Sequence, residues 1–160
     1  MKLPALCITL ATSSLLTPFA LGAPAPTKPV ISLAAAKAAV SAVSALPQAH
    51  HAPFVISVVD DGGHLVYLER ADGVPSSMVE ASILKAQGAA GYGASTKVLE
   101  QNAVQGHPGF LDLPASLPME GGVPVRINGQ LAGAVGVAGG VSSDDGAFAE
   151  KAAAALAAGS

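Results

Sequence analysis

The sequence has little charge, few aromatic residues and almost no sulfur. Of its 160 residues, 12% are charged and 4% are aromatic, tryptophan is absent, and Cys7 is the single cysteine. One cysteine cannot form an intramolecular disulfide or a zinc site built from several cysteines. These absences exclude a disulfide-stapled scaffold, so stability must come from a buried core.

The small number of basic residues argues against nucleic acid as a partner. Eight Lys and Arg stand against eleven Asp and Glu, whereas nucleic-acid binding needs a basic face. The charged fraction is also about half of the usual 25%, too low to cover the surface of a monomer. Because uncovered apolar surfaces usually contact another subunit, we expect a homo-oligomer.

Residues 1–22 have the pattern of a signal peptide. Lys2 precedes an apolar run that Pro18 interrupts and that ends in small residues near Gly22, too broken to span a membrane. Cleavage there would remove Cys7, leave no membrane span and yield a secreted or periplasmic protein. Residues 23–30 would form a proline-rich spacer, and residues 31–160 are long enough for one domain.

The rest of the chain carries alternating helix and strand patterns. Two tight hairpins are expected, one through Asp61-Gly62-Gly63 and one through Asn128-Gly129. Because hairpins rather than crossovers join the strands, we predict an α+β fold with a mainly antiparallel sheet of about four to five strands flanked by helices. Helices are predicted over 32–46, 76–90, 95–104 and 142–158, and strands over 54–60, 64–70, 123–127 and 130–139.

The segment "LAGAVGVAGG" at 131–140 has one bare strand face. By alternation, one face carries Leu131, Val135 and Val137, and the other carries Ala132, Ala134, Gly136 and Ala138. Such a face admits another backbone at close range. We expect the alanine-rich first or last helix to pack there, with a flat macrocycle or a second subunit as the alternatives.

Two helices carry further patterns. The helix over 76–90 is predicted to lay a stripe on the sheet and to keep Lys85 on its flank, and Ser142 with Asp145 resembles a capping box for the last helix. The first helix should begin at an N-cap, Ser32. The expected buried stripes are Leu33, Ala36, Val40 and Val43 in the first helix and Val79, Ile83, Ala86 and Ala90 in the helix over 76–90.

Five segments carry a family resemblance, in order "SLAAAKAAV", "VVDDGGHLVYLERADG", "KAQGA", "GGVPVRINGQLAGAVGVAGG" and "DDGAFAEKA". Together they resemble the GlcG/HbpS family of haem-binding and haem-degrading domains, which is related to the PduO C-terminal domain. The resemblance covers residues 31–158. It implies a compact domain with a mainly antiparallel sheet, assembly into homo-oligomers, and haem or a corrinoid-type tetrapyrrole as a ligand.

Haem iron needs an axial donor such as His, Tyr or Met. The candidate metal ligands are His64, beside the first hairpin turn, and His107, in the long loop over 105–122; each could equally be a solvated residue. His50 and His51 are interpreted as part of an exposed loop. The other possible donors are Tyr67, Tyr92, Met78 and Met119.

Cations and glycines supply the other candidate binding residues. Arg70 could bind a haem propionate or form an ion pair, and Asp72 and Gly73 follow it in a turn. Lys85 could neutralise an acidic ligand group or pair with a carboxylate, for which Asp60 and Asp72 are the candidates. Gly121 and Gly122 would let a ligand approach closely or make a turn.

We therefore predict an exported, oligomeric haem-binding protein that captures, senses or degrades haem. No "GxSxG", "HExxH" or Walker motif occurs, so catalysis is left open. The alternative is an enzyme or accessory protein for carboxylated metabolites such as 2-hydroxy acids, with Lys85, Arg70 and Asp72 holding the carboxylate. A third possibility is a structural oligomer without a ligand.

Overall fold

The computed structural model describes residues 27–159 of the chain. The predicted signal peptide and residues 23–26 of the predicted spacer lie outside the described residues. Residues 27–30 have no regular secondary structure, and Lys28 forms an ion pair with Asp61. Within 27–159, no helix is long and apolar enough to cross a membrane.

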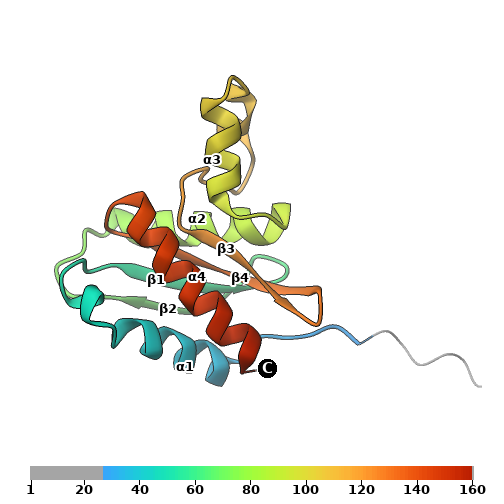
Figure 1. The fold of residues 1–160 in the computed structure, drawn as a ribbon. Helices are drawn as coiled ribbons and strands as arrows, with labels where there is room; N and C mark the ends of the chain where they lie inside the picture. The colour runs from blue at the N-terminus through green and yellow to red at the C-terminus, as the bar shows by residue number, and fades with distance from the viewer. Residues whose placement is uncertain (1–26, 160) are drawn as a thin grey trace, which may run out of the picture.

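One four-stranded antiparallel sheet, with strand order β2-β1-β4-β3, forms the centre of the molecule. Helices α1 and α4 lie on one face of it and α2 on the other (Figure 1). The α+β prediction is therefore confirmed. The strands are β1 (Val55–Asp60), β2 (Leu65–Arg70), β3 (Gly122–Ile127) and β4 (Gln130–Ala138), and the helices are α1 (Leu33–Ser44), α2 (Ser77–Tyr92), α3 (Thr96–Val104) and α4 (Ser142–Ala158).

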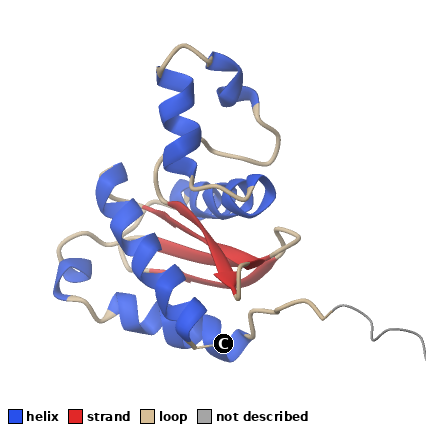
Figure 2. Cartoon of the chain, turned by 45° about the vertical axis from the view of Figure 1, so that its right-hand side comes forward, coloured by secondary structure: helices blue, strands red, loops and turns tan. Residues whose placement is uncertain are grey.

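The loop predicted over 105–122 contains a short helical turn. Residues Pro108–Asp112 form a 3-10 turn that packs on α3. Together with α3 this segment projects away from the sheet in both views of the chain (Figure 2). A second 3-10 turn, Pro47–His50, follows α1 and leads into β1.

Both hairpins form where the sequence predicted them. At the β1–β2 turn the Asp60 carboxylate accepts the backbone N–H groups of Gly62 and His64, each at 2.9 Å. At the β3–β4 turn, Asn128 and Gly129 have φ of 52° and 80°. Two successive positive φ values are what a type I′ turn requires, and they match the twist of the flanking strands.

The main core lies between the sheet and the α1–α4 layer. Ser32 caps α1, since its Oγ accepts the N–H of Ala35 at 3.1 Å. Phe54 and Phe148 meet in this core with ring centroids 4.7 Å apart. The predicted α1 stripe is wrong at Leu33, which is 50% exposed; the buried α1 residues are Ala36, Ala39, Val40 and Val43.

The bare face of β4 receives a helix, but that helix is α2 rather than α1 or α4. A Cβ placed on Gly136 would lie 2.0 Å from the Ser82 carbonyl oxygen and 2.6 Å from the Ala86 nitrogen. The first and last helices instead cover the face that carries Val135 and Val137. The physical reason is that the face of β4 with the larger side chains, Val135 and Val137, contributes to the main core, and α1 and α4 pack on that core.

A β-bulge also changes which residues share each face. Val125 pairs with Gly133 and Arg126 with Leu131, so Ala132 is the extra residue on β4. The bulge shifts the alternation, and Ala132 joins Val135 in the main core. The prediction that Ala132 belongs to the bare face is therefore wrong.

The buried face of α2 also differs from its predicted stripe. Val79 and Ile83 are only partly buried, because the close approach of β4 admits only small groups beneath the helix. The helix therefore turns its small residues, rather than its largest apolar ones, toward the sheet. Its buried residues are Ser82, Lys85, Ala86, Gly88, Ala89 and Ala90.

Candidate functional site

A buried ion pair joins α2 to the first turn of α4. Lys85 Nζ lies 2.9 Å from Asp145 Oδ2 and 3.0 Å from the Val137 carbonyl oxygen. The two side chains are only 3% and 5% exposed. Lys85 is thus paired, as one interpretation held, but its partner is Asp145.

The predicted partners of Lys85 are wrong for reasons of position. Asp60 lies at the β1–β2 turn and binds backbone N–H groups there. Asp72 is exposed in the turn after β2. Asp145 was expected to cap α4, but α4 begins without a side-chain cap, and Asp145 Oδ1 accepts the Gly140 N–H at 3.1 Å.

Two predicted glycines complete this region. A Cβ on Gly121 would lie 2.9 Å from Lys85 Nζ, and a Cβ on Gly122 would lie 2.3 Å from the Lys85 carbonyl oxygen. Gly121 also has φ of 130°, which side chains rarely allow. The structure therefore brings Lys85 together with the adjacent pair Gly121-Gly122, which lies in a different segment of the sequence.

A cavity of about 300 Å³ opens beside the ion pair. Apolar side chains of α2 and of the segment before β3 form much of its wall, and the end of β4, the loop after it and the first turn of α4 form the rest. Its lining residues are Met78, Ala81, Lys85, Leu117, Met119, Ala138, Gly139, Gly140, Ser142 and Asp145. We call this space the Lys85 pocket.

The residues of the "ERADG" segment lie elsewhere. Arg70 ends the edge strand β2, and its register partner Val55 separates it from Ala138 on β4. Asp72 and Gly73 are exposed in the following turn, where Gly73 has φ of 79°. None of the three lines the Lys85 pocket. Binding of a haem propionate by Arg70 stays a prediction.

The two predicted metal ligands are both on the surface. The His64 side chain is 83% exposed, with Nδ1 3.3 Å from Asp60 Oδ1. The turn that carries His64 follows Asp60, whereas Ala138 of the Lys85 pocket pairs with Val55 at the other end of β1. Five residues of extended strand, about 17 Å, separate Val55 from Asp60. His107 is exposed at the start of the projecting 3-10 turn. Ligation of iron by either residue stays a prediction.

A larger hollow of about 390 Å³ lies between the segment after α1 and the exposed side of α4. Its lining residues are Gln48, His51, Ala52, Asp144, Ala147, Phe148 and Lys151. His51, which was predicted to lie in an exposed loop, is exposed and also lines this hollow. The α4 members follow a spacing of three, four and seven residues, which marks one helix face, but this spacing does not show which segment lies against that face.

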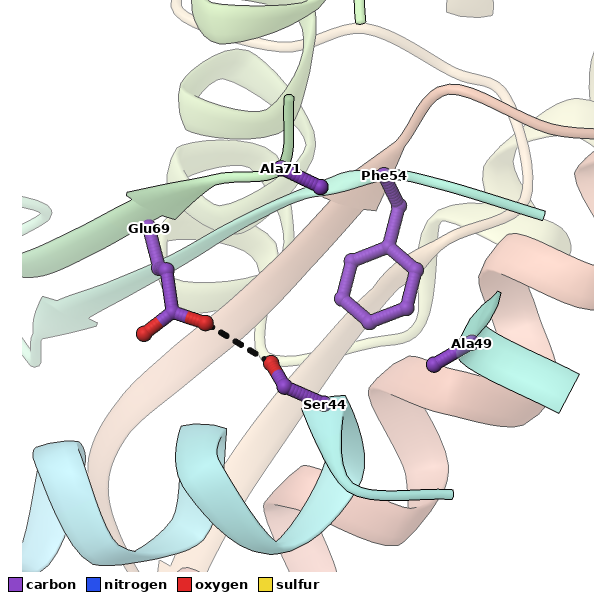
Figure 3. Close-up of a pocket in the computed structure, with 5 residues that line it drawn as sticks. All are labelled: Ser44, Ala49, Phe54, Glu69 and Ala71. Carbon is purple, nitrogen blue, oxygen red and sulfur yellow. Dashed lines mark hydrogen bonds between the residues drawn. The ribbon is translucent and has the colours of Figure 1, made fainter. Parts of the chain in front are cut away.

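A third, smaller hollow of about 140 Å³ lies between α1 and the end of β2 (Figure 3). Glu69 points toward Ser44 across it, and Ser44 Oγ donates a hydrogen bond of 2.8 Å to Glu69 Oε1. The other oxygen of Glu69 accepts the Tyr67 hydroxyl at 3.0 Å. Each oxygen of the Glu69 carboxylate is therefore already hydrogen bonded to a hydroxyl group of the protein.

Two electrostatic effects accompany these contacts. The hydrogen bond to Glu69 raises the pKa of Tyr67 above its usual value. The His64 backbone N–H, helped by that of Gly62, lowers the pKa of Asp60. Among residues 27–159, no group of three or more His, Cys, Asp or Glu side chains is arranged to hold a metal ion.

Comparison with known proteins identifies relatives along most of the chain. The family model described as "Haem degrading protein HbpS-like" matches residues 31–154. Protein GlcG of Escherichia coli is 38% identical over 111 residues, which cover 69% of this chain and 83% of GlcG.

Solved structures show the same fold. The crystal structure of Klebsiella pneumoniae protein ORFY has a TM-score of 0.78 and 29% identity, covering 87% of this chain and 99% of that one. A double mutant of Streptomyces reticuli HbpS has a TM-score of 0.74 and 27% identity, covering 96% and 99%.

Proposed function

Because this chain belongs to the HbpS-like family of haem degrading proteins, we propose that it binds haem in the hollow beside His51. The observation that carries the proposal is the set of groups that line this hollow. An imidazole, an aromatic ring and a lysine, from His51, Phe148 and Lys151, lie around one space of about 390 Å³.

Each of these groups suits a different part of haem. The His51 imidazole can supply the axial nitrogen that haem iron takes. Ala52 and Ala147, with the small accessible part of the largely buried Phe148, offer apolar surface to the macrocycle, and Lys151 offers an ammonium to a propionate. Bound haem would supply an iron centre for redox or oxygen chemistry, while the protein holds and orients it.

Of the described histidines, His51 is the one whose surroundings fit haem best. His64 and His107 are exposed on a hairpin turn and on the projecting segment, and neither lines any of the hollows described above. An exposed imidazole alone provides no apolar surface against which a macrocycle could be buried. The proposal therefore assigns the axial role to His51, and the two exposed histidines serve as controls.

Titration of the purified chain with hemin, followed by absorbance, tests the proposal. We expect a saturable change of the Soret band that His51→Ala weakens at least about tenfold. The matched control is the double variant His64→Ala/His107→Ala, which should bind hemin as the parent does. Unchanged binding by His51→Ala, or loss of binding in the double variant alone, would overturn this assignment. Circular dichroism of each variant checks its fold.

We further propose that the chain is exported and assembles into homo-oligomers. The signal-like pattern of residues 1–22 supports the first statement. Sparse charge and exposed apolar side chains such as Leu65 and Leu111, 51% and 61% exposed, support the second. N-terminal sequencing of the exported protein should find cleavage near Gly22, and light scattering should find a mass above one chain. Retention of Met1 and a monomeric mass would contradict these two statements.

A further inference from the structure

The Lys85 ammonium has a hydrogen-bond donor to spare. A lysine ammonium carries three N–H groups, and Lys85 Nζ is hydrogen bonded to two acceptors, Val137 O and Asp145 Oδ2. With only 3% of its side chain exposed, Lys85 has little access to bulk water. It does line the Lys85 pocket, so a ligand there is the natural acceptor for the third N–H.

The charge around this donor limits the kind of acceptor. Asp145 Oδ2 lies 2.9 Å from the same nitrogen, so the pair is neutral as a whole. A ligand carboxylate would approach Asp145 as closely as it approaches Lys85 and would lose its hydration in an apolar space. An uncharged carbonyl group accepts a hydrogen bond without that cost.

The residues that line the Lys85 pocket indicate which kind of molecule fits around the carbonyl group. Met78, Ala81, Leu117 and Met119 present apolar groups to the pocket, and methionine side chains adapt easily to the shape of a ligand. A volume of about 300 Å³ lies at the lower limit of ligand sites. A compact molecule with an apolar body therefore fits better than a large cofactor.

The segment that closes one side of the pocket is strained. Ala115 has φ of 49°, which is uncommon for a residue other than glycine. The neighbouring Ser116 Oγ is buried without a hydrogen-bond partner, which costs free energy. Leu117 and Met119 of the pocket wall belong to this same segment. A rearrangement of residues 115–119 could relieve both costs, so this wall is the part of the pocket best suited to admit a ligand.

We propose that the Lys85 pocket binds a small, uncharged carbonyl compound with an apolar body, whose oxygen accepts the third N–H of Lys85. This site is separate from the hollow at His51 and does not depend on haem binding. It also differs from the carboxylate site expected from the sequence, because Asp145 already neutralises Lys85.

Methyl spectra of the full chain, labelled with ¹³C at its methionine methyl groups, test this inference. The probes share one ring and differ in charge: cyclohexanone, cyclohexanecarboxylate and cyclohexylammonium. We expect cyclohexanone to shift the Met78 and Met119 signals in a saturable way, and the two charged probes to bind at least about tenfold more weakly. Absence of a shift with cyclohexanone, or tighter binding of a charged probe, would overturn the inference.

A pocket-filling variant provides the matched control. Ala81 lines the pocket from α2, and leucine is a good helix former there, so Ala81→Leu should fill the space without removing the ion pair. We expect this variant to lose the cyclohexanone shifts while its hemin titration stays unchanged. Shifts that persist in Ala81→Leu would place the probe elsewhere and contradict the proposal.

Discussion

Gly136 of β4 lies directly against the backbone of α2 at Ser82. A Cβ on Gly136 would stand 2.0 Å from the Ser82 carbonyl oxygen, closer than any side chain tolerates. The contact joins two backbones, so no rotamer change could relieve such a clash. It explains why β4 is bare on this face and fixes how closely α2, and with it Lys85, approaches the sheet.

Substitution of Gly136 should therefore be costly. We expect Gly136→Ala to lower the free energy of unfolding by about 1–3 kcal/mol or more, because the added methyl group forces helix and strand apart. Denaturant titration measures the change.

Gly91 of α2, the helix that Gly136 contacts, offers the matched control. It is exposed within α2, and a Cβ there would meet nothing within 4 Å. Gly91→Ala should raise the free energy of unfolding by about 0.5–1 kcal/mol, since alanine restricts the unfolded chain. Equal effects of the two substitutions would contradict the packing argument.

Local sequence signals predicted the elements well. The hairpin at Asn128-Gly129 could be predicted because Asn and Gly readily adopt the positive φ that a type I′ turn requires at both central positions. The N-cap at Ser32 is equally local, since its partner is Ala35, three residues away. Such features depend on neighbours in the chain, so a sequence pattern is enough to place them.

Features that depend on distant segments were predicted less well. The pairing of Lys85 with Asp145 joins residues 60 positions apart, and near Asp145 a capping pattern offered a plausible local alternative. The bulge at Ala132 arises from pairing with β3, so alternation alone could not reveal it. The hollow at His51 needs α4 to lie beside the segment after α1, a tertiary contact without a local signature.

The buried Lys85–Asp145 pair should show strong coupling in a double-mutant cycle. Lys85→Met or Asp145→Asn alone leaves one buried charge without its counterpart, which costs about 3–5 kcal/mol. The double variant removes both charges and keeps an acceptor at 145 for the Gly140 N–H. We expect its loss of stability to be smaller than the sum of the single losses by at least about 1 kcal/mol. Denaturant titration of the four proteins measures this, and additive losses would contradict a coupled pair.

Acidification should weaken the β1–β2 turn through Asp60. The backbone N–H of His64 is the main cause that lowers the pKa of Asp60 in the folded chain. A lowered folded pKa contributes stability above the unfolded pKa of 3.8, and this contribution is lost as pH falls through the folded value. The stability difference between the parent and Asp60→Asn should therefore shrink from about pH 5 to about pH 2. Urea titrations at both pH values measure it, and a constant difference would contradict the assignment.

The Tyr67–Glu69 contact gives the opposite pH dependence, at the alkaline end. The hydrogen bond of 3.0 Å to Glu69 raises the pKa of Tyr67 above 10.0. A raised folded pKa means that its contribution to stability is complete below the unfolded pKa and is lost as pH rises through the folded value. In a Tyr92→Phe background, phenolate absorbance reports Tyr67 alone among the two tyrosines.

Glu69→Gln should return the pKa of Tyr67 toward 10.0, because the amide keeps an acceptor but removes the negative charge that opposes ionisation of the phenol. Ser44→Ala is the matched control, since Ser44 binds the other oxygen of Glu69 and leaves the phenol contact in place. We expect the serine variant to titrate as the parent does. An identical titration for Glu69→Gln would show that Glu69 does not perturb Tyr67, and the hydrogen bond between them would then not hold in solution.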